Sequence, residues 1–95
     1  KVAYSQYITL QGQIDCGIWI EARSPNVDST ALEHFAQGFL NGMTLESRFD
    51  FWKKPYPITP KQTFLWIDKY CRENPLSSPI TGMKKLFDQR KSDSN

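Results

Sequence analysis

The chain contains a single histidine, His34, which limits the catalytic chemistry that it could support. Nucleophilic catalysis needs a serine or cysteine beside a base. His34 falls next to the apolar stripe of a predicted helix, a position typical of a surface or half-buried residue. The carboxylates are scattered, and Asp68 and Glu73 lie five residues apart on one predicted helix, where they do not face each other. Because Walker, dinucleotide and EF-hand motifs are also absent from the sequence, we expect no enzyme and no cofactor.

Cys16 and Cys71 are the only cysteines of the chain. Without a CxxC motif or a second histidine, they do not indicate a metal site. An even number of cysteines in a small chain favours one disulfide and an oxidising compartment. The alternative is a pair of buried free thiols in a cytosolic protein. A disulfide between Cys16 and Cys71, which are far apart in the sequence, would stabilise the fold by about 4 kcal/mol, because it restricts the unfolded chain.

An aromatic and basic segment at residues 49–56 could serve either binding or packing. Trp, Tyr and Arg dominate the binding energy of protein interfaces, so the segment could be a protein-contact loop. Alternatively, Phe51 and Trp52 could fill the end of a small helical core. Both interpretations hold if Phe51 points inward while Trp52 or Tyr56 points outward. The candidate partner-binding residues are Phe49, Phe51, Trp52, Lys53, Lys54 and Tyr56.

These candidates must be positioned by one small domain spanning residues 1–95. The net charge of +2 is too small to indicate nucleic acid, and no apolar run approaches the roughly 18 residues of a membrane span. Residues 1–14 alternate loosely between apolar and polar side chains and predict a short extended segment. The first residue is Lys1, which fits either removal of a signal peptide or a trimmed chain.

Two helices are predicted before the aromatic segment. The first is capped by Asp15 and ended by Pro25, and the second is capped by Asp28 or Ser29. A loop is then expected at residues 45–58. The apolar stripe of the second helix contains Leu32, Phe35, Phe39 and Met43, and beside it Gly38 and Gly42 predict a notch where another helix or the N-terminal segment packs closely.

Two further helices are predicted after the aromatic segment. Thr59-Pro60 opens the third helix and Asn74-Pro75 ends it. Ser77 or Ser78 caps the fourth. Its apolar residues are Ile80, Met83, Leu86 and Phe87, and its predicted solvent-facing residues are Lys84, Lys85, Arg90 and Lys91. We therefore expect an all-α fold, a small four-helix orthogonal bundle with a short extended N-terminal segment, closed by one disulfide.

Three short motifs place a cysteine, a glycine pair and an Asn-Pro step in order along the chain. They are Cys16-Gly17-x-Trp19-x-x-Ala22-Arg23, Gly38-Phe39-Leu40-Asn41-Gly42 and Trp66-Ile67-Asp68-x-Tyr70-Cys71-Arg72-x-Asn74-Pro75-Leu76. Together they resemble a family of small exported bacterial helical proteins, similar to the Rap/Tai immunity proteins of type VI secretion amidases. The match covers residues 16–87, and the spacing of the Tyr-Cys and Asn-Pro steps is its most specific part.

This resemblance implies an all-helical, disulfide-closed protein that is periplasmic or secreted. Immunity members bind a peptidoglycan amidase and block its active site, often as dimers. We therefore expect a binding or inhibitor protein that acts by steric occlusion of another protein, with an amidase effector as the partner and a homodimer as a further association. The alternative is a small periplasmic acid-stress chaperone, whose apolar faces would become exposed when carboxylates are protonated.

Overall fold

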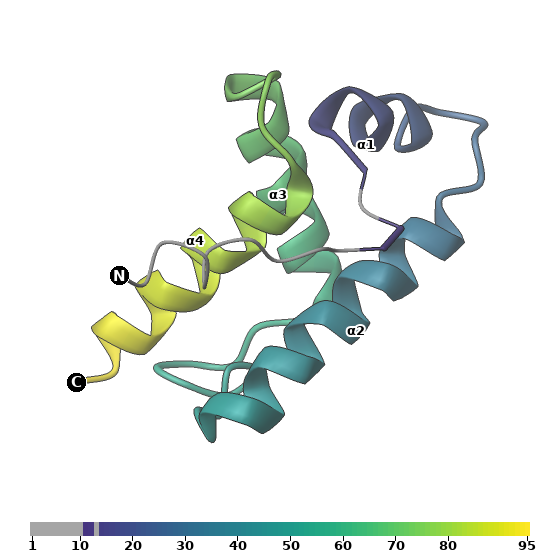
Figure 1. Cartoon of the computed structure of the whole chain (residues 1–95). Helices are drawn as coiled ribbons and strands as arrows, with labels where there is room; N and C mark the ends of the chain where they lie inside the picture. Colours follow the sequence, from purple (N-terminus) through teal and green to yellow (C-terminus); the bar gives the residue numbers. More distant parts are fainter. Residues whose placement is uncertain (1–10, 13) are drawn as a thin grey trace.

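The computed structural model describes residues 11, 12 and 14–95, so the predicted extended segment at residues 1–14 lies almost wholly outside the described residues. Within these ranges the chain forms four helices and no strand (Figure 1). They are α1 (Cys16–Ala22), α2 (Thr30–Ser47), α3 (Pro60–Glu73) and α4 (Pro79–Asp93). The all-α prediction of a small helical bundle is confirmed.

Local capping determines where most of the helices begin. The side chain of Asp15 accepts a hydrogen bond from the backbone N–H of Ile18 at 2.8 Å, which starts α1 as predicted. Thr59 and Gln62 form a reciprocal capping box before Pro60, the first residue of α3. Ser78, one of the two predicted candidates, caps α4. The sequence signals for these three helix starts are confirmed.

The start and the end of α2 differ from the simplest prediction. Ser29 occupies the N-cap position, but its hydroxyl donates to the Glu33 carboxylate at 2.7 Å. It is Asp28 that accepts from the backbone N–H of Thr30, at 3.0 Å. The predicted loop boundary at residue 45 is wrong, because α2 continues to Ser47 and ends only where Arg48 adopts a left-handed conformation with φ 63°.

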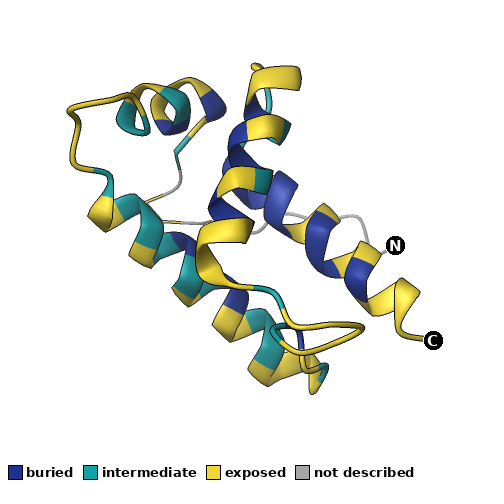
Figure 2. Cartoon of the chain, turned by 180° about the vertical axis from the view of Figure 1, so that it is seen from behind, coloured by how far each residue is buried: buried dark blue, intermediate teal, exposed yellow. Residues whose placement is uncertain are grey.

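Helix α3 is the centre of the bundle and packs against each of the other three helices. The continuous buried faces lie on α3 and α4, whereas α2 is mostly half-buried or exposed (Figure 2). The core consists of Cys16, Trp19, Ala36, Leu40, Phe51, Phe64, Ile67, Cys71, Ile80, Met83, Leu86 and Phe87. The predicted disulfide between Cys16 and Cys71 is confirmed, and it joins the start of α1 to the last turn of α3.

The contact between α3 and α4 depends on a glycine that the sequence pattern did not single out. A Cβ atom placed on Gly82 would lie 2.6 Å from the Tyr70 ring, well inside van der Waals contact. The Tyr70 ring is held in place because its hydroxyl bonds to Ser77 at 2.8 Å and it stacks on Trp66. The absence of a side chain at Gly82 therefore allows the two helices to approach.

Candidate functional site

The aromatic segment forms part of the loop at residues 48–59, between α2 and α3. Its central residue, Phe51, is fully buried, and its ring stacks on Phe87 of α4 with 5.4 Å between the ring centroids. Phe49 is half-buried and contacts the same Phe87 ring edge-on at 5.6 Å. Phe51 therefore belongs to the core, as the packing interpretation required, and has no exposed surface for a partner.

Arg90 of α4 holds the base of this loop, which corrects the prediction that it faces solvent. The residue is only 4% exposed. Its Nε and Nη2 donate to the carbonyl oxygen of Phe51 at 3.1 and 2.9 Å, and Nη2 also donates to the carbonyl oxygen of Tyr56 at 2.6 Å. The guanidinium also lies over the rings of Phe51 and Tyr56, at 5.2 and 5.1 Å from their centroids. The planar guanidinium donates to two loop carbonyls at once. A charged residue that faced solvent at the end of the helix would make no such contacts.

The charge of Arg90 is not balanced by a nearby carboxylate. Across the described ranges, no Asp or Glu forms a salt bridge with it. Burial disfavours the charged form and lowers the pKa of Arg90 from its usual value. Arginine nevertheless stays protonated in proteins, so the base of the loop contains a buried positive charge.

The outer part of the loop is exposed and internally bonded. Lys53 and Lys54 are exposed, and their backbone N–H groups both donate to the carbonyl oxygen of Asp50, at 3.1 and 3.0 Å. The backbone N–H of Ile58 donates to the carbonyl oxygen of Trp52 at 3.0 Å, which closes the loop at its base. The loop thus has a defined conformation from which two ammonium groups project.

Tyr56 and Trp52 give the loop its aromatic surface. Tyr56 is 65% exposed, although its ring covers the Arg90 guanidinium. Trp52 is half-buried, with its ring edge-on to Phe51, and its indole N–H donates to the Asn41 side chain of α2 at 2.8 Å. Of the six candidate residues, Lys53, Lys54 and Tyr56 are therefore the most accessible, and Trp52 and Phe49 are accessible in part.

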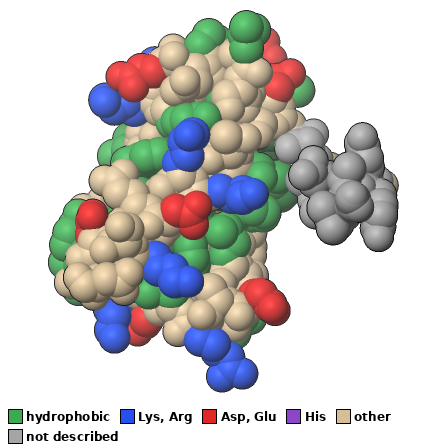
Figure 3. Space-filling view, turned by 60° about the vertical axis from the view of Figure 1, so that its left-hand side comes forward, with side chains coloured by type: hydrophobic (Ala, Val, Ile, Leu, Met, Phe, Trp, Pro, Cys, Tyr) green, Lys and Arg blue, Asp and Glu red, His purple; other side chains and the backbone are tan. Residues whose placement is uncertain are grey.

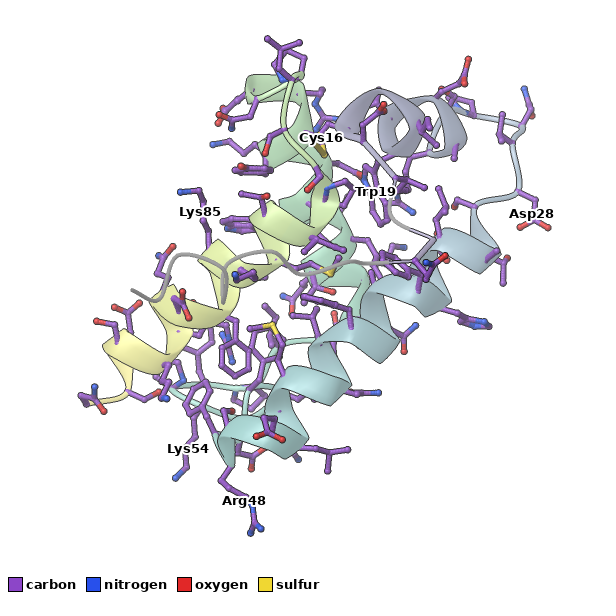
Figure 4. All side chains as sticks on the ribbon, viewed as in Figure 1. Cys16, Trp19, Asp28, Arg48, Lys54 and Lys85 are labelled. Carbon is purple, nitrogen blue, oxygen red and sulfur yellow. A yellow bond between two sulfur atoms is a disulfide. The ribbon has the colours of Figure 1, made fainter. Side chains whose placement is uncertain are left out.

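Positive charge is concentrated in the half of the sequence that contains this loop. Residues 48–95 contain ten Lys or Arg and five Asp or Glu, whereas residues 11–47 contain one Arg and five Asp or Glu. On the face shown in Figure 3, basic side chains stand beside hydrophobic patches. Lys54 and Arg48 project outward at one end of the molecule, away from Cys16 and Trp19 (Figure 4). The loop itself contains Arg48, Lys53 and Lys54 against one carboxylate, Asp50, so it can attract an acidic surface.

A second polar cluster, which sequence reasoning missed, joins α1, α2 and α3. Asp68 of α3 accepts from the indole N–H of Trp19 at 2.7 Å and from Nε and Nη2 of Arg23, both at 2.9 Å. Arg23 also bonds to Glu33 of α2 at 2.6 Å. Trp19, Arg23 and Asp68 all lie in the motifs that carry the family resemblance, which was the only available signal that they belong together.

This cluster acts as a structural clip between three helices. Hydrogen bonding to Asp68 raises the pKa of Arg23, so the guanidinium stays charged. The guanidinium also contacts the faces of the Trp19 and Phe64 rings. Among the residues that the structure describes, no buried side-chain nitrogen or oxygen lacks a hydrogen-bond partner. The cluster is therefore fully satisfied without a ligand.

No other helix packs closely on the glycine pair of α2, and the predicted alternative, packing of the N-terminal segment, lies outside the described residues. A Cβ atom on Gly38 or Gly42 would meet no described atom within 4 Å. The two glycines line an open apolar groove with Phe39, Met43 and Phe87. The predicted apolar stripe is half-buried, because α2 directs Ala36 and Leu40 into the core and leaves the stripe at the edge of the contact.

His34, the single histidine of the sequence, is exposed on α2. Within residues 11, 12 and 14–95, no three His, Cys, Asp or Glu side chains gather to hold a metal ion. None of the helices in the described part is long and apolar enough to cross a membrane.

Comparisons of the chain with protein-family models, curated proteins and solved structures find no match.

Proposed function

We propose that this protein is a non-catalytic binding protein that blocks a partner protein by steric occlusion. The contact surface is the loop at residues 48–59, with Lys53, Lys54 and Tyr56 as its accessible residues. The observation that carries the proposal is that the loop has a buried part and an exposed part. Phe51 anchors it in the core, while two ammonium groups and an exposed tyrosine project from it. A rigid loop loses little conformational entropy when it binds, which favours this kind of contact.

An acidic cleft is the partner surface that best complements this loop. The loop lies in the basic half of the sequence, and the Arg90 charge at its base lacks a carboxylate partner among the described residues. Attraction between exposed charges mainly raises the association rate and weakens as salt is added. Tyr56 and the accessible part of Trp52 would then supply apolar contact area at the centre of the interface.

The disulfide and the sequence resemblance indicate the setting of this interaction. A disulfide persists in oxidising compartments, which supports a periplasmic or secreted protein. The resemblance to amidase immunity proteins supports a peptidoglycan amidase effector as the partner, and it also implies a homodimer, which sedimentation equilibrium of the full chain would test. In this proposal the loop enters or covers the amidase active site.

The direct test is inhibition of an amidase effector encoded beside the gene of this protein. Purified full chain with its disulfide intact should bind that effector and abolish hydrolysis of peptidoglycan at equimolar concentration. The Tyr56→Ala variant should bind at least tenfold more weakly, because it loses an exposed aromatic contact. Folded protein that neither binds nor inhibits the effector would contradict the proposed function.

A second candidate, an acid-stress chaperone, is favoured by the clip around Arg23. The clip joins α1, α2 and α3 through ion pairs of Arg23 with Asp68 and Glu33. Ion pairs with carboxylates weaken in strong acid, which would loosen the apolar faces beneath the clip. A chaperone should suppress the aggregation of an unrelated unfolded protein at about pH 2–3 and not at neutral pH.

A further inference from the structure

The conformation of the loop depends on one side chain from a distant part of the sequence. Arg90 lies 39 residues from Phe51, yet its guanidinium bonds to the carbonyl oxygens of both Phe51 and Tyr56. These two carbonyls stand at the two ends of the exposed turn that contains Lys53 and Lys54. A single planar group therefore ties both ends of the turn to α4.

The burial of Arg90 and the closed loop depend on each other. A buried guanidinium needs hydrogen-bond acceptors, and among the described residues Arg90 finds them only in these two loop carbonyls. If the loop opened, the guanidinium would lose three hydrogen bonds and its contacts with the Phe51 and Tyr56 rings. If Arg90 were replaced, two loop carbonyls would lose their donors. The loop and the arginine therefore stabilise each other.

We propose that Arg90 is a positioning residue that holds the loop in its binding conformation before the partner arrives. The effect of Arg90 on partner binding rests on the proposed function above. Its effect on the conformation of the free loop does not. Because Arg90 fixes the loop in advance, the cost of ordering it is not incurred on association. Lys53, Lys54 and Tyr56 then act as the contacts, and Arg90 acts through them.

Arg90→Lys separates positioning from simple burial of a positive charge. Lysine keeps the charge and a long side chain, but it has one nitrogen and cannot form the planar fork that spans both carbonyls. In the free full chain, we expect the backbone N–H groups of Lys54 and Ile58 to exchange with solvent deuterium at least tenfold faster than in the wild type. The amides of α3 should keep their protection to within about twofold, because the opening is local.

Phe87→Leu is the matched control, since it weakens the core beneath the same loop without touching its carbonyl partners. It should accelerate exchange in the loop and in α3 together. If Arg90→Lys behaves in the same way, Arg90 is only a core residue and the proposal is overturned. Unchanged exchange in the loop of Arg90→Lys would overturn it as well.

The binding arm uses the amidase effector described above as the probe. Arg90→Lys should weaken binding about tenfold, mainly through slower association, while Lys91→Met, an exposed neighbour on α4, should bind like the wild type. Faster loop exchange with unchanged amidase affinity would overturn the positioning role and leave the proposed function intact. A wild-type chain that binds no effector would remove the proposed function, and the exchange measurement would still decide whether Arg90 holds the loop.

Discussion

Trp19 and Asp68 meet across the interface between α1 and α3, where the indole N–H donates to the carboxylate at 2.7 Å. Arg23 binds the same carboxylate through two nitrogen atoms. The short helix α1 is thus held by a polar clip in addition to the disulfide at its first residue. An isolated helix of seven residues has little stability of its own, so these tertiary contacts determine whether α1 forms.

Asp68→Ala should lower the free energy of unfolding by about 3 kcal/mol, because it leaves the Trp19 N–H and part of the Arg23 guanidinium without their acceptor. Urea denaturation measures this change. Glu73→Ala is the matched control on the same helix, since Glu73 is exposed and forms a surface salt bridge with Lys69 at 3.3 Å. It should change stability by less than about 0.5 kcal/mol. Equal effects of the two substitutions would show that the clip does not stabilise the fold.

Two helical glycines should respond to alanine in opposite directions. Gly82→Ala should lower stability by about 1–3 kcal/mol, because the new methyl group would overlap the Tyr70 ring. Gly38→Ala should raise stability by about 0.5–1 kcal/mol, because no atom of the described residues lies within 4 Å of the new methyl group and alanine favours a helix. Thermal unfolding of both variants tests the pair. A stabilising Gly82→Ala substitution would contradict the close approach of α3 and α4.

Trp52→Ala should lower stability by about 2 kcal/mol, less than the 3–5 kcal/mol expected for a fully buried tryptophan, because the ring is only half-buried. Asn41→Ala removes only the hydrogen bond to the indole and should cost about 1 kcal/mol. Chemical denaturation of both variants separates ring packing from the hydrogen bond. A Trp52→Ala protein as stable as the wild type would show that the ring does not pack on Phe51.

Asp28 should titrate below its unfolded pKa of 3.8, because hydrogen bonds from the side chain and backbone of Thr30 favour the carboxylate. A lowered folded pKa means that the stabilisation is present above pH 3.8 and disappears as the pH falls through the folded pKa. Carbon-detected NMR of the Asp28 carboxyl group measures the midpoint. The Thr30→Ala variant should move this midpoint upward, and a wild-type midpoint above 3.8 would contradict the capping role.

Local signals in the sequence predicted much of the fold. Asp15, Thr59-Pro60 and Ser78 mark helix starts because each satisfies backbone groups within a few residues of itself. The disulfide could be predicted because only two cysteines are present. The end of α2 was placed too early, because it depends on the left-handed conformation of Arg48, for which the sequence contains no glycine signal.

The long-range polar contacts could not be predicted in the same way. Arg90 resembles a solvent-facing charge at the end of a helix, and its acceptors are backbone carbonyls of a loop 39 residues earlier. Arg23 and Asp68 are 45 residues apart, and nothing local pairs them. The prediction that another helix packs on Gly38 and Gly42 was wrong for a related reason, since α2 turns Ala36 and Leu40 toward the core instead.

The central claim, that the loop at residues 48–59 contacts an acidic surface of the partner, is tested most directly by charge reversal. The measurement is the association rate constant of the full chain with the amidase effector at low salt. The Lys53→Glu, Lys54→Glu double variant should associate at least tenfold more slowly than the wild type and lose most of its salt dependence. The Lys84→Glu, Lys85→Glu double variant reverses the same amount of charge on exposed residues of α4 and should stay within about threefold of the wild type. The account would be contradicted if both double variants associated equally slowly, or if the Lys53→Glu, Lys54→Glu variant associated as fast as the wild type.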